Sequence, residues 1–427
     1  MRKFLALLED RGELRKISES VDPRYEVSAY LCLNGAGPAL KFERVAANAM
    51  PIVANLLCSR ERIALGLGTS TLELQQRIVA AIGNPRDPRT AERAPCQDVV
   101  EEKPDLAKLP VPTFFEHETG PYVTAGIIAA RDVESGEANL SYARLKPLGA
   151  NRAFIGIAPN HHLAVMARRA SRLPIAVTLG NGPAVSIAAA LYLGFGEDEL
   201  RVAAALGAGE LEVVNCTSAD IVVPAHCEIV LEGVLHSDQT IDEGPVSEYH
   251  GMYENYGRGY VVEFNRLTRR RDAMLQVIQP GYYPEHVWIG GEAIAAGLAR
   301  RLGARVAVTP GGAGRLHAVI ATKDEARNAI HATWSAVNLI KMVTVVDEDV
   351  DPWDPVQVEL AIATRMRAER DIVVMPAMPS NRSDPLARNG MVGKLGIDAT
   401  RKSGDRADWR PAEPPAAVLE RVRRRLT

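Results

Sequence analysis

The chain has 427 residues, of which 47% are hydrophobic and 24% charged, and its formal net charge at pH 7 is −3. This composition excludes a disordered or fibrous protein, and the balanced charge gives no global field that would draw the chain onto nucleic acid or anionic lipid. The five cysteines are scattered and never form a CxxC pair, which argues for reduced thiols rather than disulfides or a zinc knuckle. No apolar run reaches the ~18 to 20 residues needed to span a bilayer, so we expect a soluble, cytoplasmic protein.

Residues 1–103 mix helical and strand patterns. The opening segment "MRKFLALLEDRGELRKI" is typical of an amphipathic helix, "PIVANLL" is a short apolar run, and "STLELQQRIVAAIG" is helical. The stretch "GNPRDPRTAERAP" is rich in proline and charge, which indicates a loop or linker. We therefore expect an N-terminal α/β domain over residues 1–103.

Residues 104–284 change to consecutive strands separated by turn signals, as in "YVTAGIIAARDV", "ANLSYARLKPLG" and "RAFIGIAP". Helical segments interrupt this meander instead of alternating with its strands. That arrangement favours an α+β fold whose central domain is a split β-barrel over a doubly wound sheet. A linking helix is expected at residues 285–302, and the alternating strands and helices of residues 303–427 predict a C-terminal α/β domain.

Two polar side chains stand out in the predicted strand "NLSYARLKPLG". Asn139 and Arg144 are five residues apart, and residues an odd number apart on a regular strand point to opposite faces. They can serve one site only if a bulge or a strand end lies between them. The alternative is an exposed Asn and a surface Arg.

Three further residues lie near predicted helix starts. His161 and His162 precede an apolar helical run, where free backbone N–H groups can hold an anion, although a His pair at a turn can equally be a cap. Glu199, in "GFGEDELRV", can be a first-turn charge. Together with Asn139, a His and a Glu would form a mixed oxygen and nitrogen site suited to Mg²⁺ or Mn²⁺.

Glu243 and Glu248 flank a Gly-Pro step in "IDEGPVSEYHGMYENYG", which indicates a turn. Two carboxylates held close together and away from water cannot both ionise cheaply, so the pKa of one rises and it becomes a proton donor. A nearby Arg would keep the other charged. An acid and carboxylate-binding site is one reading of this segment, and an ordinary acidic turn is the other.

The segments "NLSYAR", "PNHH", "IVVPAHCEIVLEG", "DEGPVSEYHGMY" and "GKLGIDAT" occur in an order and at separations that resemble the UbiD family of reversible decarboxylases, which use prenylated FMN. The likeness runs over nearly the whole chain. It implies that the central split barrel binds the flavin and that the C-terminal domain mediates oligomerisation. It also implies non-oxidative decarboxylation of an aromatic, heteroaromatic or α,β-unsaturated acid through a covalent adduct with prenylated FMN.

The resemblance carries family roles onto matching positions. It implies that Asn139, His162 and Glu199 bind Mn²⁺ or Mg²⁺ against the cofactor phosphate, with K⁺ as a further ion. The catalytic residues it implies are Arg144, Glu243 and Glu248, with Glu248 as the acid and Glu243 orienting Arg144. The cofactor-binding residues that it implies are Asn139, Ser141, Tyr142, Ala143, Arg144, His161, His162 and Glu199.

The resemblance also bears on the substrate and partners. It implies that "YYPEHVWIGG" brings Glu285, His286, Trp288 and Ile289 toward the substrate, with His286 contacting a second polar or anionic substituent or capping its helix. The chain's length and N-terminus are similar to members acting on furan, pyrrole or indole carboxylates. A separate flavin prenyltransferase must supply the cofactor, and a homodimer or larger homo-oligomer is expected. The segment "DPVQV" has Val and Gln where many relatives place a Lys that contacts phosphate.

Two other classes of protein compete with this interpretation. A conventional FMN or NAD oxidoreductase would be expected to carry a GxGxxG between a strand and a helix, which the chain lacks; the glycine-rich "TPGGAGRLH" precedes a predicted strand and indicates a turn. A non-catalytic UbiD-like assembly protein would have no need to keep all six of the proposed catalytic and metal-binding residues.

Overall fold

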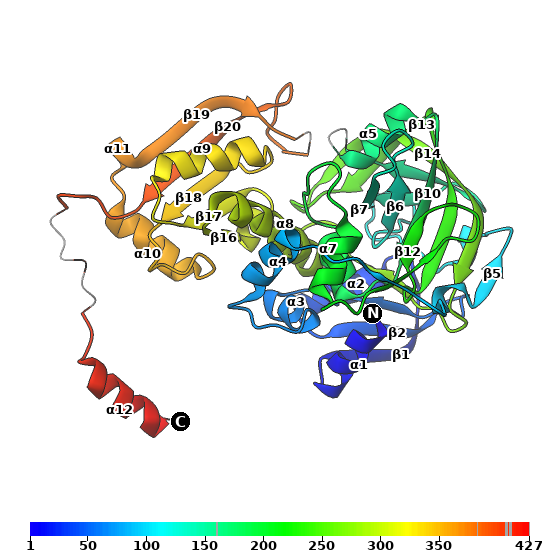
Figure 1. Ribbon diagram of the computed structural model, residues 1–427, viewed down its shortest axis with the longest axis horizontal. Helices are drawn as coiled ribbons and strands as arrows, with labels where there is room; N and C mark the ends of the chain where they lie inside the picture. The colour runs from blue at the N-terminus through cyan, green and yellow to red at the C-terminus, as the bar shows by residue number, and fades with distance from the viewer. Residues whose placement is uncertain (159–160, 382, 406–408, 410–411, 427) are drawn as a thin grey trace.

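The structure is a computed structural model that describes residues 1–158, 161–381, 383–405, 409 and 412–426. The chain forms two lobes (Figure 1). The larger lobe holds the N-terminal and central regions, and the smaller lobe holds the C-terminal sheet. The long helix α8 (Pro284–Leu302) runs between them.

The N-terminal region is a four-stranded mixed sheet with helices packed against it. Helix α1 buries Phe4, Leu5 and Leu8, as its amphipathic sequence predicts. The sheet order is β1-β2-β3-β15, so a strand from after the central region completes it. The elements are α1 (Arg2–Asp10), β1 (Leu14–Val21), α2 (Glu26–Asn34), β2 (Ala39–Val45), β3 (Ile52–Ala54), α3 (Arg60–Gly66), α4 (Leu74–Gly83) and β15 (Leu275–Val277).

The central region is an antiparallel sheet in the order β7-β6-β10-β13-β14-β9-β8, with β5 paired to β14. Its strands are β5 (Val99–Glu101), β6 (Ile127–Arg131), β7 (Ala138–Tyr142), β8 (Arg144–Pro147), β9 (Arg152–Gly156), β10 (Arg172–Leu179), β13 (Ile229–Ser247) and β14 (Tyr253–Arg269). The accompanying elements are β4 (Arg89–Thr90), η1 (Pro95–Gln97), η2 (Leu106–Lys108), α5 (His162–Arg169), α6 (Pro183–Ala188), α7 (Glu199–Leu206), β11 (Glu212–Asn215) and β12 (Val222–Pro224).

The mixed α+β architecture is as predicted, but a closed barrel is not confirmed. Across the part of the chain that the structure describes, the named strand pairings run from β7 at one edge to β8 at the other without joining them. Pairings also cross the predicted domain boundary at residue 103, because β4 pairs with β11 and β5 pairs with β14.

The C-terminal lobe is a five-stranded sheet in the order β16-β17-β18-β20-β19, parallel in its centre and antiparallel at its two edges. Its elements after α8 are β16 (Arg305–Val308), η3 (Pro310–Gly312), β17 (His317–Ala321), α9 (Ala326–Ala336), β18 (Met342–Val346), α10 (Pro355–Arg365), α11 (Ala368–Asp371), β19 (Ile372–Pro379) and β20 (Met391–Ala399). The last helix, α12 (Ala416–Leu426), buries none of its described side chains. Among the described helices, none is long and apolar enough to cross a membrane.

Candidate active site

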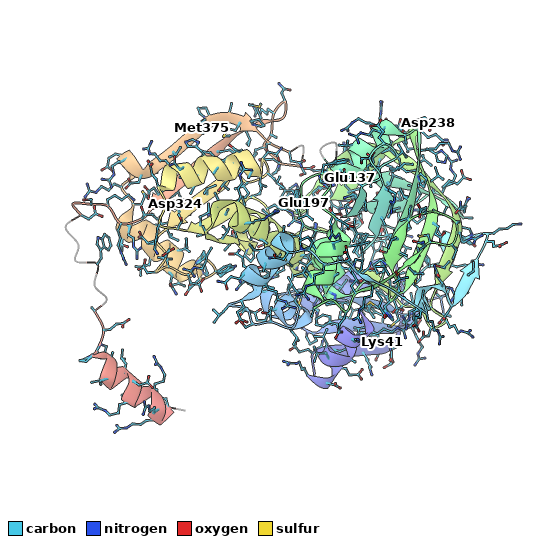
Figure 2. The ribbon with its side chains drawn as sticks, viewed as in Figure 1. Lys41, Glu137, Glu197, Asp238, Asp324 and Met375 are labelled. Carbon is cyan, nitrogen blue, oxygen red and sulfur yellow. The ribbon has the colours of Figure 1, made fainter. Side chains whose placement is uncertain are left out.

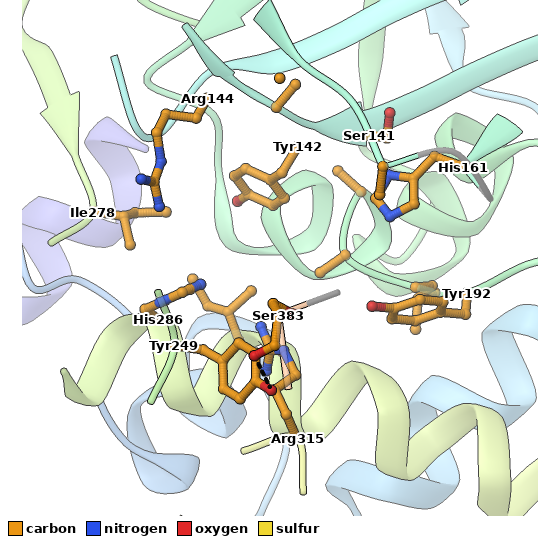
Figure 3. Close-up of a pocket in the computed structure, with 18 of the residues that line it drawn as sticks. Ser141, Tyr142, Arg144, His161, Tyr192, Tyr249, Ile278, His286, Arg315 and Ser383 are labelled. Atoms are coloured by element: carbon orange, nitrogen blue, oxygen red, sulfur yellow. Dashed lines mark hydrogen bonds between the residues drawn. The ribbon is translucent and has the colours of Figure 1, made fainter. Parts of the chain in front are cut away.

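A cavity of about 360 Å³ lies where the central sheet faces α8 and the C-terminal lobe (Figure 3). Side chains from β7, β8 and the starts of α5 and α7 form one part of its wall. The turn after β13, helix α8 and loops of the C-terminal lobe form the opposite part. Residues far apart in the sequence therefore meet around one space of the size that a small ligand needs.

A break between two strands brings Asn139 and Arg144 to the same cavity. Strand β7 ends at Tyr142 and β8 begins at Arg144, so the alternation of a regular strand is interrupted at Ala143. Ser141, Tyr142 and Ala143 line the cavity together with Asn139 and Arg144. This is the strand end that their odd spacing required.

Asn139 and Glu199 meet at one end of the cavity, although they are far apart in the chain. The amide Nδ2 of Asn139 donates to Glu199 Oε1 at 3.3 Å, and the backbone N–H of Leu140 donates to Oε2 at 2.8 Å. Asp198 caps helix α7, which leaves the side chain of Glu199 free to point to β7. Glu199 is only 2% exposed, and burial raises the pKa of its carboxyl to about 8 despite these hydrogen bonds.

His161 and His162 line the same cavity at the start of α5. The His162 ring packs edge-on against Phe195 with centroids 5.3 Å apart. Burial lowers the pKa of both imidazoles, and for His162 the nearby carboxylates Glu137 and Glu197 oppose that shift. Those two carboxylates lie near the middle of the molecule in Figure 2. Neutral imidazole is the form that binds metal ions.

Arg144 has an unsatisfied donor. Its Nη2 donates to the carbonyl of Ser247 at 2.8 Å, whereas its buried Nη1 has no hydrogen-bond partner among the described residues. The buried Glu118 accepts from the hydroxyl of Ser247 at 3.2 Å and interacts electrostatically with Arg144. Sequence reasoning missed Glu118, because nothing in "TFFEHETG" marks it as the partner of a residue on β8.

Glu243 is not where the sequence analysis expected it. The segment around Gly244 and Pro245 is extended and belongs to β13, so Glu243 is a strand residue, and the turn begins only at Glu248. The Glu243 carboxylate accepts hydrogen bonds from Lys146, at 3.1 Å, and from Thr119. Glu243 does not line the cavity and does not orient Arg144 through a direct contact.

The electrostatics of Glu243 favour its charged form, although Lys146 rather than Arg144 is its cationic partner. Burial alone would raise the pKa of its carboxyl, but the hydrogen bonds from Thr119 and Lys146 outweigh burial and the pKa is lowered. Glu243 is therefore held as a carboxylate. Glu248, five residues further along, is half-buried and lines the cavity. Glu243 lies within β13, whereas Glu248 follows the last residue of that strand, Ser247, so the end of the strand separates the settings of the two glutamates.

Helix α8 places only half of the predicted substrate residues at the cavity. His286 and Ile289, three residues apart, share its cavity-lining face with Gly290. Glu285 points away, and its Oε1 accepts from the backbone N–H groups of Leu56 and Leu57, both at 2.9 Å. Trp288 packs against the main hydrophobic core. The expectation that Glu285 and Trp288 face the substrate is therefore wrong, because helical periodicity turns them to other sides.

The environment of His286 favours its neutral form, which suits a contact with a polar substituent better than one with an anion. Its Nδ1 lies 2.9 Å from the carbonyl oxygen of Gly281, so Nδ1 carries the proton and Nε2 is an acceptor in the neutral ring. Burial and the positive charges of Arg315 and Arg144 lower the pKa of His286 to about 3. A neutral ring with an unprotonated Nε2 does not attract an anion.

Further cavity residues lie outside the predicted set. The lining residues that the sequence analysis missed include Thr124, Tyr192, Tyr249, Tyr256, Ile278, Arg315, Leu339, Asn381 and Ser383. Arg315 follows η3 in the segment "TPGGAGRLH", which does form a turn. The sequence did contain one indication that Arg315 lacks a nearby acidic partner along the chain: no Asp or Glu occurs between Glu292 and Asp324.

Comparisons with known proteins agree with this architecture. Residues 89–283 match the Rift-related domain of 3-octaprenyl-4-hydroxybenzoate carboxy-lyase, residues 295–399 its C-terminal domain and residues 5–82 its N-terminal domain. The anhydromevalonate phosphate decarboxylase of Methanosarcina mazei is 33% identical over 414 residues, which cover 94% of this chain and 96% of that protein.

Two solved structures are similar over almost their full length. The UbiD-class enzyme HmfF from Pelotomaculum thermopropionicum in complex with FMN has a TM-score of 0.92 and 35% identity, covering 98% of both chains. An evolved dimeric form of HmfF in complex with prenylated FMN has a TM-score of 0.88 and 34% identity, covering 98% of this chain and 99% of that one. The chain belongs to the UbiD family and is a carboxy-lyase of the prenylated-FMN class.

Proposed function

We propose that this protein reversibly removes CO₂ from a planar α,β-unsaturated, aromatic or heteroaromatic carboxylic acid. One observation carries the proposal: the unsatisfied Nη1 of Arg144 and the carboxyl of Glu248 belong to one cavity. A buried guanidinium donor gains most from a charged acceptor such as a substrate carboxylate.

Asn139 and Glu199, which are hydrogen-bonded to each other, provide part of a divalent-ion site, and we infer that His162 from the same cavity lining completes it beside a flavin phosphate. Glu199 is a buried carboxylate without a cationic partner among the described residues, and Asn139 and His162 lie on the same cavity. Both Mn²⁺ and Mg²⁺ accept such oxygen and nitrogen ligands. We assign Asn139, His162 and Glu199 as metal ligands, and Ser141, Tyr142, Ala143 and His161 as contacts of prenylated FMN. We include K⁺ as a further ion, which elemental analysis of the purified protein measures.

The reaction requires one bond to break and one proton to be delivered. Arg144 holds the carboxylate, and loss of CO₂ breaks the bond between the carboxyl carbon and the adjacent carbon. When bound, prenylated FMN supplies the electron sink for the electron pair that CO₂ leaves behind. Glu248 then donates a proton to that carbon, and Glu118 and Ser247 keep Arg144 in place. Glu243 and Lys146 form an ion pair beside this group and do not take the proton-transfer role.

The acid that we would test first is anhydromevalonate phosphate, the substrate named for the curated relatives. That compound class is an unsaturated acid with a phosphate ester. The sequence analysis favoured furan, pyrrole or indole carboxylates, and these form the second set. The segment "DPVQV", which has Val and Gln where many relatives place a phosphate-contacting Lys, lies at the start of α10. Its Val356 is 73% exposed and does not line the cavity.

Partners follow from the same proposal. A flavin prenyltransferase supplies the cofactor, and the C-terminal lobe provides the contacts of a homodimer or larger assembly. A cytoplasmic location agrees with the reduced thiols that the structure shows at all five cysteines.

The decisive experiment is to co-express the protein with a flavin prenyltransferase and identify its bound small molecule by absorption spectrum and mass. Prenylated FMN with stoichiometric Mn²⁺, followed by CO₂ release or deuterium exchange with one of the acids, is the expected result. Ordinary FMN or NAD without decarboxylation would contradict the proposal and favour an oxidoreductase.

A further inference from the structure

Arg315 is a cavity arginine that the proposed chemistry does not use. Its guanidinium lines the cavity, and its Nη1 donates to the carbonyl of the neighbouring Gly314 at 2.8 Å. Within the described part of the chain it forms no ion pair with a carboxylate; Glu248 acts on it only as a more distant charge. A poorly solvated cation without a paired anion is unfavourable unless a ligand supplies the anion.

The position of this guanidinium depends on a glycine of α8. A Cβ added to Gly290 would lie 1.8 Å from both terminal nitrogens of Arg315. The guanidinium therefore occupies the space that any other residue at position 290 would fill. This contact directs Arg315 to the cavity side of α8, where His286 and Ile289 also lie.

Arg315 lies across the cavity from the residues assigned to the cofactor. In Figure 3, Ser141, Tyr142, Arg144 and His161 occupy one side, and Arg315, His286, Tyr249 and Ser383 occupy the other. The second side also presents the polar residues Asn381 and Ser383. On this second side of the cavity, the neutral His286 can only accept a hydrogen bond through Nε2, whereas Arg315 carries a positive charge.

We propose that Arg315 forms a second anion subsite, which binds a phosphate monoester or carboxylate that the substrate carries in addition to its reacting carboxylate. This inference rests on the proposed decarboxylase function and adds to it the residue that recognises the second anionic group of such an acid. A guanidinium pairs with phosphate or carboxylate through two parallel hydrogen bonds.

The test compares two acids on cofactor-loaded protein: anhydromevalonate phosphate and anhydromevalonate, which has a neutral hydroxyl instead of the phosphate. A dicarboxylic unsaturated acid, compared with its monoester, tests the other source of the second anion. The wild-type protein should prefer the dianionic member of at least one pair. In Arg315→Met, kcat/KM for that acid should fall roughly 10- to 100-fold, as expected for loss of a charge-assisted contact, with little change for its partner.

Three further variants make the result specific. Gly290→Ala should displace the guanidinium and reduce the same preference, whereas Gly297→Ala on the same helix meets no atom within 4 Å and should leave it unchanged. Arg315→Lys retains the charge without the fork and should restore part of the preference. If Arg315→Met does not fold, the Arg315→Lys variant still tests the subsite.

The outcomes separate this inference from the proposed function. If wild-type protein decarboxylates acids but prefers neither dianionic compound, or if Arg315→Met changes both members of a pair equally, the subsite is refuted and the decarboxylase function stands. If the Arg315 variants lose bound prenylated FMN, the arginine serves the cofactor phosphate and the subsite is again refuted. If loaded wild-type protein releases CO₂ from no acid, the proposed function itself fails.

Discussion

Glu243 and Glu248 show how two residues of one type acquire different tasks within a single segment. Glu243 is 5% exposed on β13 and pairs with Lys146, whereas Glu248 begins the following turn and faces the cavity. An ion-paired carboxylate whose pKa is lowered is a poor proton donor. The assignment of Glu248 as the acid therefore depends on its position.

Glu248→Gln should abolish proton donation and leave the cofactor bound. General acid catalysis contributes roughly 10²- to 10⁴-fold to a rate, so kcat should fall by that order while the flavin content per protein stays constant. The measurements are CO₂ release and deuterium exchange into the product. Glu263→Gln, at an exposed position of β14, is the matched control. Unchanged turnover in Glu248→Gln would rule out its role as the acid.

His162→Ala tests the metal end of the cavity. Removing one ligand should weaken retention of the divalent ion at least ~10-fold, and the flavin whose phosphate the ion holds should be lost with it. Elemental analysis and flavin absorbance of the purified protein measure both. His331→Ala, on the exposed face of α9, should retain the full content. Undiminished metal and flavin in His162→Ala would remove His162 from the ligand set.

At the scale of elements, α8 distributes its side chains between two structural tasks. His286, Ile289 and Gly290 face the cavity, whereas Glu285 fastens the start of the helix to the N-terminal region through the amides of Leu56 and Leu57. Burial raises the pKa of the Glu285 carboxyl from 4.5 to about 7, although the hydrogen bonds from Leu57 and Leu56 oppose the shift.

This raised pKa makes stability depend on pH. Between pH 4.5 and about 7 the folded chain keeps a proton on Glu285 that the unfolded chain has lost. The free energy of unfolding therefore falls as pH rises through that window, by at most about 3 kcal/mol from this group, and levels off above it. In Glu285→Gln this contribution disappears, so the stability of the variant relative to wild type should increase with pH.

Denaturant unfolding at several pH values between 4 and 8 measures the effect. Glu359→Gln, at an exposed position of α10, should give a curve parallel to that of the wild type. The buried Glu292, whose pKa burial raises to about 7, contributes to the same window in all three proteins. A Glu285→Gln curve that is also parallel to the wild type would contradict the assignment.

At the scale of the molecule, the cavity exists because two lobes meet. Tyr249, directly after Glu248, donates its hydroxyl to the carbonyl of Ser383 in the C-terminal lobe at 3.0 Å (Figure 3). Its ring packs with Ala313 and Leu339 of that lobe. The turn that carries the proposed acid is therefore held against the lobe that carries Arg315.

Tyr249→Phe keeps the ring and removes only this hydrogen bond. We expect kcat/KM to fall about fivefold, which corresponds to about 1 kcal/mol for one hydrogen bond, with unchanged flavin content because Tyr249 is remote from the proposed metal ligands. Steady-state kinetics and flavin absorbance measure these quantities. Tyr282→Phe, at a position that is 50% exposed, should behave as wild type. A loss of flavin in Tyr249→Phe would show that the contact serves cofactor binding instead.

Local patterns in the sequence determined the mixed α+β class, the amphipathic helix α1, the strands around Asn139 and the need for a strand break before Arg144. These features depend on neighbours within a few residues, and such periodicities are readable without the fold. The family motifs also determined the class of reaction, because they hold the chemistry-bearing residues in recognisable order.

The tertiary structure alone decided which side chains share the cavity. Glu118 interacts electrostatically with Arg144, Lys146 pairs with Glu243, and Arg315 reaches the cavity from another lobe, and no local spacing encodes these relations. Helical rotation separated His286 and Ile289 from Glu285 and Trp288, and the end of β13 at Ser247 separated Glu243 from Glu248. The physical reason is the same in each case: the direction of a side chain depends on the secondary structure that carries it, and its partner depends on packing between distant segments.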